Sequence, residues 1–223
     1  MLGRLRSSSE RTPPQRAPRI RPVALHLGTE LGLALGAYFA GGISPGYWLV
    51  RWRTGSDVRE QGSGGTGATN TARILGAGGF ALTFALDVAK GALAVAAGRW
   101  LEVDVEWLAV SALAVTAGHV WPMQLGFRGG KGVAPLIGAW LALAPLALAP
   151  CLLFGALLLV FSRRYLRSAL TGLGLLAPAT WWQTENTLAT VIAAAATVLV
   201  LYTHRAHFKR EASDALAQRG APR

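Results

Sequence analysis

The sequence predicts an all-α integral membrane protein with about seven transmembrane helices, some of them short or broken, and with glycine-rich loops on the cytoplasmic side. Two observations carry this prediction. Only 15% of the 223 residues are charged and 52% are hydrophobic, whereas a soluble domain carries about 25% charged residues. The apolar residues also gather in long runs, and a helix that crosses a bilayer needs roughly 20 of them. The core would then be the helix bundle itself.

Seven segments are apolar enough to enter or cross a bilayer, and the sequence defines their ends only to within a few residues. In the first, the GGISPG stretch of residues 41–46 predicts a break or kink. Residues 132–163 fit either one bent hairpin or two short helices around Pro145 and Pro150. The predicted segments are 23–50, 74–98, 106–124, 132–149, 150–163, 168–183 and 187–204.

Basic residues gather in alternate loops, and this pattern predicts the orientation. They occupy residues 51–73, 128–131, 163–167 and 205–210, while the intervening loops carry acidic residues. The positive-inside rule therefore places both glycine-rich loops and the C-terminus in the cytoplasm, and seven crossings place the N-terminus outside. Six arginines in residues 1–22 favour the opposite side. The loops agree among themselves, so we give them the greater weight.

The ends of the chain differ in composition from the middle. We predict a disordered basic arm over residues 1–22, a polytopic membrane domain over 23–205 and a basic cytoplasmic tail over 206–223. The net charge of +11 comes mostly from arginines in short loops and at the ends. That placement indicates affinity for anionic lipid rather than for nucleic acid. With a single cysteine, Cys151, and no HExxH pattern, we expect neither a metal nor a cofactor.

Two glycine-rich basic stretches are the most informative part of the chain. Residues 62–73 read GSGGTGATNTAR, and residues 126–133 read GFRGGKGV. Glycines let backbone amides approach phosphate oxygens, and the basic side chains neutralise the charge. A flexible, solvated loop is the alternative interpretation. The first stretch contains G-x-G-x-x-G without a preceding strand, and the second has the wrong spacing for a Walker A loop, so neither predicts a nucleotide fold.

Three ionisable residues lie within or at the end of apolar segments, where burial in lipid is costly. Asp87 and Lys90 are three residues apart, and we favour a structural ion pair between them. His119 lies in GHVWP, close in sequence to the second glycine-rich stretch. It is either an interfacial hydrogen-bonding residue or a candidate acid, base or donor beside a phosphate site.

Three blocks of sequence carry a family resemblance from about Leu31 to Arg210. The first is DVREQGSGGTGATNTARILG with the LDVAKG that follows it, the second is GHVWPMQLGFRGGKGVA, and the third is YTHRAHFKR. On these residues the chain resembles the bacterial membrane acyl-phosphate:glycerol-3-phosphate acyltransferases, the PlsY family. The first two blocks are long and specific, and the third is weaker.

The resemblance implies a multi-pass helical enzyme of the bacterial cytoplasmic (inner) membrane, with its active site facing the cytoplasm. Such an enzyme transfers a fatty acyl group from acyl phosphate to the 1-hydroxyl of sn-glycerol 3-phosphate. The products are lysophosphatidic acid and inorganic phosphate. The implied partners are these two small molecules and membrane lipid, with no nucleic acid and no cofactor, and we expect a monomer.

The family's functional positions map onto this sequence residue by residue. The implied catalytic residues are His119, Lys131 and Ser63. The implied substrate-binding residues are Asn70, Arg73, Arg128, Gly129, Gly130, Gly132, His204, Arg205 and His207. Arg128 stands where the family usually has a lysine.

The sequence also departs from the family pattern. Gly65 replaces the asparagine of SGN, Ala206 and His207 replace the last two residues of HREN, and Ser168 is displaced relative to the usual serines. GGISPGY of residues 41–47 stands for GSIPFGY. These departures leave two further hypotheses: a divergent paralogue that binds lipid or phosphate without this activity, and a transporter of organic phosphates.

The chemistry expected of such a site is mainly positioning, because acyl phosphate already has a good leaving group. Lys131, Arg128 and the second stretch would hold one phosphate, and Ser63, Asn70 and Arg73 the other, or the reverse. No Ser-His-Asp triad is evident, so we expect no acyl-enzyme. The base is either His119 or the phosphate of glycerol 3-phosphate, whose second pKa is about 6.

Overall fold

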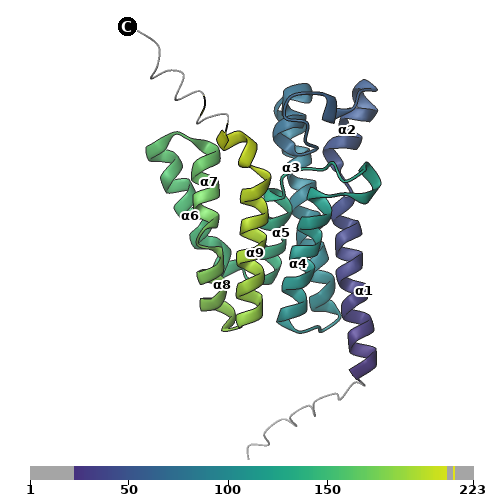
Figure 1. The fold of residues 1–223 in the computed structure, drawn as a ribbon, viewed down its shortest axis with the longest axis vertical. Helices are drawn as coiled ribbons and strands as arrows, with labels where there is room; N and C mark the ends of the chain where they lie inside the picture. Colours follow the sequence, from purple (N-terminus) through teal and green to yellow (C-terminus); the bar gives the residue numbers. More distant parts are fainter. Residues whose placement is uncertain (1–22, 210–212, 214–223) are drawn as a thin grey trace, which may run out of the picture.

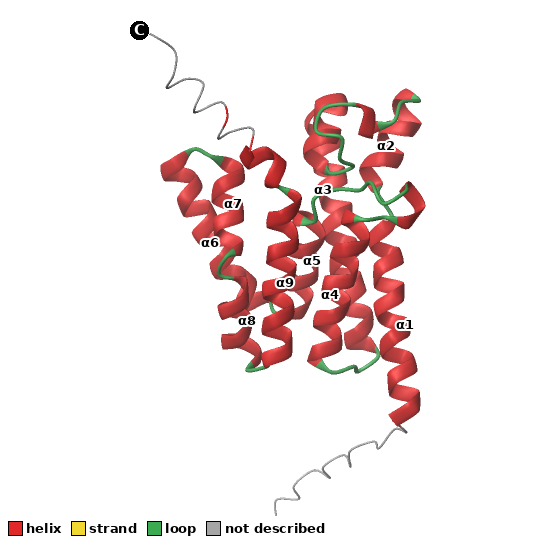
Figure 2. Cartoon of the chain, viewed as in Figure 1, coloured by secondary structure: helices red, strands yellow, loops and turns green. Residues whose placement is uncertain are grey.

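The computed structural model describes residues 23–209 and residue 213, and over this part of the chain it contains helices and loops but no strand (Figure 2). The predicted arm over residues 1–22 lies outside the described residues, as does most of the predicted tail. The helices are α1 (Val23–Gly42), α2 (Pro45–Thr54), η1 (Val58–Glu60), α3 (Ala68–Trp100), α4 (Val105–Val120), η2 (Met123–Leu125), α5 (Val133–Leu143), α6 (Pro145–Ser162), α7 (Tyr165–Leu173), α8 (Leu176–Thr184) and α9 (Thr187–Thr203).

The helices run up and down in one bundle. Figure 1 shows the start of α1 at one end and the last turn of α9 at the other, which is also the end that holds α2. The chain between α2 and α3 and the chain between α4 and α5 both lie at that second end. We call residues 55–67 the first glycine loop, residues 121–132 the second glycine loop, and this side of the bundle the loop end.

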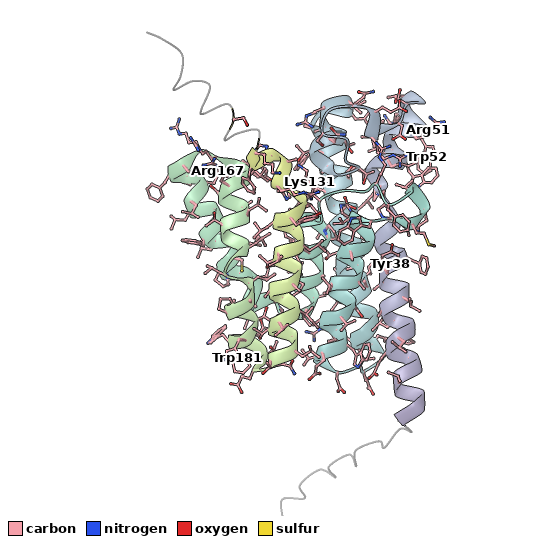
Figure 3. All side chains as sticks on the ribbon, in the orientation of Figure 1. Tyr38, Arg51, Trp52, Lys131, Arg167 and Trp181 are labelled. Atoms are coloured by element: carbon pink, nitrogen blue, oxygen red, sulfur yellow. The ribbon has the colours of Figure 1, made fainter. Side chains whose placement is uncertain are left out.

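The protein is an integral membrane protein, as predicted. Among the described residues, three helical stretches are long and apolar enough to cross a membrane: Ala68–Trp100, Val105–Leu125 and Pro145–Ser162. Val133–Leu143 and Thr187–Thr203 are shorter apolar helices. Tryptophans mark both ends of the bundle, with Trp52 at the loop end and Trp181 at the opposite end (Figure 3). That placement matches an interfacial aromatic belt.

Several segment boundaries differ from the prediction. The break in the first segment is confirmed at Ile43–Ser44, because Pro45 begins α2 and its fixed φ suits a first helical position. The break within residues 132–163 lies at Ala144, so the predicted boundary at residue 149 is wrong, and Pro150 lies inside α6. Residues 168–183 were predicted as one segment, but they divide between α7 and α8.

The helix α3 begins six residues earlier than predicted and is kinked at Gly76. This glycine has φ 67° and ψ −162°, a backbone conformation that L-residues rarely adopt. The kink separates a short polar helical turn, which holds Asn70 and Arg73, from the long apolar part of the helix. Asn70 and Arg73 therefore lie on a helix rather than in a loop, whereas Ser63 lies in the loop before it.

Close glycine contacts hold α3 against α5. A side chain at Gly91 would overlap the Pro135 carbonyl, and one at Gly138 would overlap the Val88 carbonyl. Helices in bilayers associate through such small residues, because lipid supplies no hydrophobic driving force between them. This contact fixes the beginning of α5, and hence the second glycine loop, relative to the ionisable residues of α3.

Candidate active site

The two glycine loops meet over a cavity of about 300 Å³ at the loop end. Its floor and walls come from α3, the end of α4, the beginning of α5 and α7. The sequence-predicted residues that line it are Ser63, Asn70, Arg73, His119, Gly130, Lys131, Gly132 and His207. Figure 3 places Lys131 near the loop end, between α9 and the helices that carry the first loop. The structure thus brings together side chains from all three blocks.

One side of the cavity is apolar, and the sequence did not reveal this. Phe80 and Phe84 of α3 stack on one another with ring centres 5.8 Å apart. Leu166, Ala169 and Leu170 of α7 line the same cavity. Helical spacing cannot show that α3 and α7 share a cavity, because it describes contacts within one helix and not the packing between two helices. The cavity therefore combines a polar, cationic part with a wall suited to an acyl chain.

Asn70 organises the first glycine loop. Its amide nitrogen donates to the carbonyl oxygens of Val58 (2.8 Å), Gln61 (2.9 Å) and Gly65 (2.9 Å). Its oxygen accepts from the Ser63 backbone N–H and from Arg73 Nη1, each at 3.0 Å. An asparagine side chain has two donor hydrogens and two acceptor lone pairs. The three carbonyl oxygens therefore share the two hydrogens, and the hydrogen-bonding capacity of Asn70 is fully used. Asn70 therefore fixes the path of the loop, while Ser63 and Arg73 line the cavity beside it.

A second anchor ties the first loop to the second. Asp57 accepts hydrogen bonds from the Arg59 backbone (2.9 Å) and from its guanidinium (2.6 Å at the closest). Arg59 in turn donates to the Leu125 carbonyl at 2.7 Å. The Arg59 hydrogen bonds hold the pKa of the Asp57 carboxyl below its usual value of 3.8. The anchor therefore depends on the charge of Asp57.

We expect this anchor to weaken in acid. A carboxyl whose pKa is lowered in the folded state stabilises that state above its unfolded pKa, and the stabilisation is lost as pH falls through the folded value. For Asp57 that window lies below about pH 4. Hydrogen exchange across residues 57–65 should therefore show protection falling as pH decreases from about 4 to about 2, in excess of the intrinsic pH effect. Asp57→Asn should lack this step, and an identical step in that variant would assign it to another group.

Backbone hydrogen bonds fix the second glycine loop against the end of α4. The N–H groups of Gly129 and Gly130 donate to the carbonyls of Val120 (3.2 Å) and His119 (3.0 Å). The Thr66 N–H of the first loop donates to the Gly129 carbonyl at 3.3 Å. Gly130 also packs directly on the His119 ring, where a side chain would overlap Nε2. The glycines are therefore needed for close packing at this point, whatever else they bind.

The predicted ion pair between Asp87 and Lys90 is present, with Oδ1 and Nζ 2.7 Å apart. His119 joins it from α4, with Nδ1 2.9 Å from Lys90 Nζ and 3.4 Å from Asp87 Oδ1. Asp87 and His119 also line the cavity. The sequence showed each residue but not the cluster, because only the packing of α3 against α4 brings them together.

The remaining predicted residues do not line the cavity. Arg128 is exposed, and Gly129 lies behind Gly130 against the carbonyls of α4. His204 is buried, with Nδ1 2.8 Å from the Val200 carbonyl, so it caps α9. Arg205 is exposed and stacks on Tyr202, 3.7 Å from the ring centre. These four positions therefore lie outside the cavity.

The departures from the family pattern are accommodated locally. The Gly65 carbonyl accepts a hydrogen bond from the Asn70 amide. His207 lines the cavity, and Ala206, which is exposed, does not. Ser168 is buried and turned toward α6, where its hydroxyl lies 2.8 Å from that of Ser162. It does not line the cavity.

Comparison with known proteins agrees with this geometry. The family model for glycerol-3-phosphate acyltransferase matches residues 31–214. This chain belongs to the glycerol-3-phosphate acyltransferase family. A glycerol-3-phosphate acyltransferase of Synechococcus sp. (strain JA-2-3B'a(2-13)) is 42% identical over 185 residues, 82% of this chain and 90% of the relative.

Two solved structures of an acyltransferase of this family have the same fold. The glycerol 3-phosphate form of PlsY (YgiH), an integral membrane glycerol 3-phosphate acyltransferase, is 29% identical, with a TM-score of 0.77 over 84% of this chain and 94% of that one. Its lysophosphatidic acid form is 28% identical, with a TM-score of 0.74 over 84% and 93%. The family resemblance in the three blocks is thus confirmed, and this chain is an acyltransferase.

Proposed function

We propose that this protein transfers a fatty acyl group from acyl phosphate to the 1-hydroxyl of sn-glycerol 3-phosphate, at the cytoplasmic face of a bacterial inner membrane. The observation that carries the proposal is a single cavity lined both by basic and hydroxyl side chains and by aromatic and aliphatic ones. Glycerol 3-phosphate is a small dianion, and the acyl donor is an anion with a long chain. One cavity meets the needs of both.

The polar side supplies the groups that hold phosphate. Arg73 and Lys131 provide positive charge, and the Ser63 hydroxyl and the His207 ring provide further hydrogen-bonding groups. Gly130 and Gly132 keep the second loop free of side chains, so a phosphate oxygen can lie close to the backbone. We assign Lys131 and the second loop to one phosphate, and Ser63 and Arg73 to the other. The acyl chain lies against Phe80, Phe84 and the α7 residues.

The reaction needs no covalent enzyme intermediate. The 1-hydroxyl oxygen attacks the carbonyl carbon of the acyl phosphate and forms the new ester bond. The bond from that carbon to the phosphate oxygen breaks, and inorganic phosphate leaves with the electron pair. The hydroxyl proton passes to a base, for which His119 and the phosphate of glycerol 3-phosphate are the two candidates. The cations stabilise the charge that develops on the leaving phosphate.

The donor can be tested directly on purified protein in lipid vesicles. We expect labelled glycerol 3-phosphate to give lysophosphatidic acid with palmitoyl phosphate, at least about 100-fold faster than with palmitoyl-CoA, because only the phosphate donor matches both parts of the cavity. Vesicles with the loop end outward should be active without detergent, since this dianion does not cross a bilayer. Equal turnover with palmitoyl-CoA would overturn the donor assignment. Inside-out vesicles of the bacterial membrane expose its cytoplasmic face, so activity that appears in them only after permeabilisation would overturn the proposed orientation.

A further inference from the structure

Lys90 is a buried cation with three polar neighbours inside the protein. Its Nζ lies 2.7 Å from Asp87 Oδ1, 2.7 Å from the Ile43 carbonyl oxygen and 2.9 Å from His119 Nδ1. An ammonium group has three donors and no acceptor, so Lys90 can only donate in these contacts. The side chains of Asp87, Lys90 and His119 are 1%, 10% and 3% exposed, so water does not compete strongly for these positions.

The contact between Lys90 and His119 determines which ring nitrogen carries the hydrogen. An ammonium can only donate, so His119 Nδ1 must accept and cannot carry a hydrogen. The alternative is that Nδ1–H donates to Asp87 Oδ1, which is 3.4 Å away. In that arrangement the Nδ1 hydrogen would lie close to the Lys90 ammonium nitrogen, which is 2.9 Å from Nδ1. The hydrogen bond to Asp87 would also be the longer of the two contacts that Nδ1 makes. The geometry therefore favours a neutral imidazole with its hydrogen on Nε2.

The Nε2 side of the ring packs against the second glycine loop, where that loop lines the cavity. Gly130 packs against Nε2, Cε1 and Cδ2, and both His119 and Gly130 line the cavity. The Nε2–H group therefore lies beside the loop that carries Lys131. An N–H group at this place can donate to an anionic oxygen held by the loop, but a nitrogen that already carries its hydrogen cannot take a proton from the substrate hydroxyl.

We propose that Asp87 and Lys90 are positioning residues that hold His119 as a fixed Nε2–H donor to a phosphate oxygen in the cavity. Asp87 orients Lys90, and Lys90 fixes the His119 tautomer. The His119 ring then supports the second glycine loop at Gly130 and donates its Nε2 hydrogen to the phosphate oxygen. The Lys90 contact with the Ile43 carbonyl ties the same cluster to the break between α1 and α2. This proposal rests on the proposed function for the identity of the anion, and it leaves the phosphate of glycerol 3-phosphate as the base.

The tautomer can be observed without any turnover. The chain has four histidines, so ¹⁵N-histidine labelling gives few signals, and the signal lost in His119→Gln identifies residue 119. We expect a neutral ring with a protonated Nε2 and a bare Nδ1, and we expect Lys90→Met to disturb this pattern. A protonated Nδ1, or a doubly protonated ring, would overturn the proposal. The result holds even if the protein fails to transfer acyl groups, so it is independent of the proposed function.

Kinetics then separate a donor from a base. A glutamine amide nitrogen occupies the place of imidazole Nε2 and can donate, whereas asparagine reaches only the Nδ1 position and alanine reaches neither. We expect His119→Gln to keep activity within about 10-fold, and His119→Asn and His119→Ala to lose about 100-fold. A required base would make all three variants equally inactive, and that outcome would contradict the proposal.

A double-mutant cycle tests whether Lys90 acts through His119. Lys90→Met and Asp87→Asn should each lower kcat by about 30- to 100-fold, and Lys90→Met should cost little more in a His119→Ala background. Lys209→Met, the same change at an exposed lysine outside the cavity, is the control and should leave activity unchanged. Independent, multiplying losses from Lys90→Met and His119→Ala would show a merely structural role and overturn the positioning assignment.

Discussion

Lys131→Ala is expected to lower kcat/KM for glycerol 3-phosphate by about 1,000-fold, which is the largest loss we expect from a single side chain. Lys131 lines the cavity and is partly buried, so its charge acts on phosphate with less screening than a surface charge. Its position is also fixed, because its carbonyl accepts from Thr203 Oγ1 at 3.0 Å and Gly132 follows with φ 85°. The measurement is steady-state turnover with palmitoyl phosphate.

Two matched variants make this expectation specific. Lys131→Arg keeps the charge but changes its shape, and it should recover part of the activity. Arg128→Ala removes a cation of the same loop that is exposed and outside the cavity, and it should cost less than about 10-fold. Unchanged elution and melting temperature would show that each variant is folded. Equal losses for Arg128→Ala and Lys131→Ala would contradict the location of the phosphate site.

The contrast between Arg128 and Lys131 shows where sequence reasoning ended. Both are basic residues in one glycine-rich stretch, and the family resemblance assigns Lys131 to catalysis and Arg128 to substrate binding. Consecutive left-handed residues, Gly126 with φ 63° and Phe127 with φ 60°, turn the chain just before Arg128. Sequence predicted that the stretch was a loop, but a positive φ at phenylalanine is not predictable from residue preference. The direction of each side chain therefore had to come from the structure.

Local spacing predicted contacts within one helix, and packing between helices supplied the rest. Asp87 and Lys90 were predicted as a pair because residues three apart share a helix face. His119 lies on α4, and nothing in its sequence neighbourhood indicated that Lys90 would reach it. Asn70 was predicted as a substrate ligand. Its five hydrogen bonds within the site loop could not be foreseen, because they depend on the path of that loop.

The fold was predictable where proline or charge marked a boundary. The break before Pro45 and the polar loops at one end of the bundle followed from such signals. The early start of α3 was missed because its first turn is polar, and polar residues beside an apolar run were interpreted as loop. The division of α7 from α8 was missed for the opposite reason. Residues 168–183 read as one apolar segment, and nothing in that reading marked a boundary within it.

Gly130→Ala is expected to lower kcat/KM by at least about 100-fold, because even a 1 Å displacement of a positioning element costs that much. The added methyl group would overlap the His119 ring, which is held from the other side by Lys90. The ring cannot retreat, so the second glycine loop must move away from the cavity and take Lys131 with it. Binding of glycerol 3-phosphate, measured by calorimetry, should weaken together with turnover.

A second substitution shows whether this overlap is the cause. The three atoms nearest to the added methyl all belong to the His119 ring, so His119→Ala removes the obstacle. The double variant should then bind glycerol 3-phosphate as well as His119→Ala alone does, although turnover stays low. Gly78→Ala is the control, because Gly78 has no atom within 4 Å of an added methyl. Weak binding that persists in the double variant would show that Gly130 acts on the ligand directly, since relief of the overlap then restores nothing.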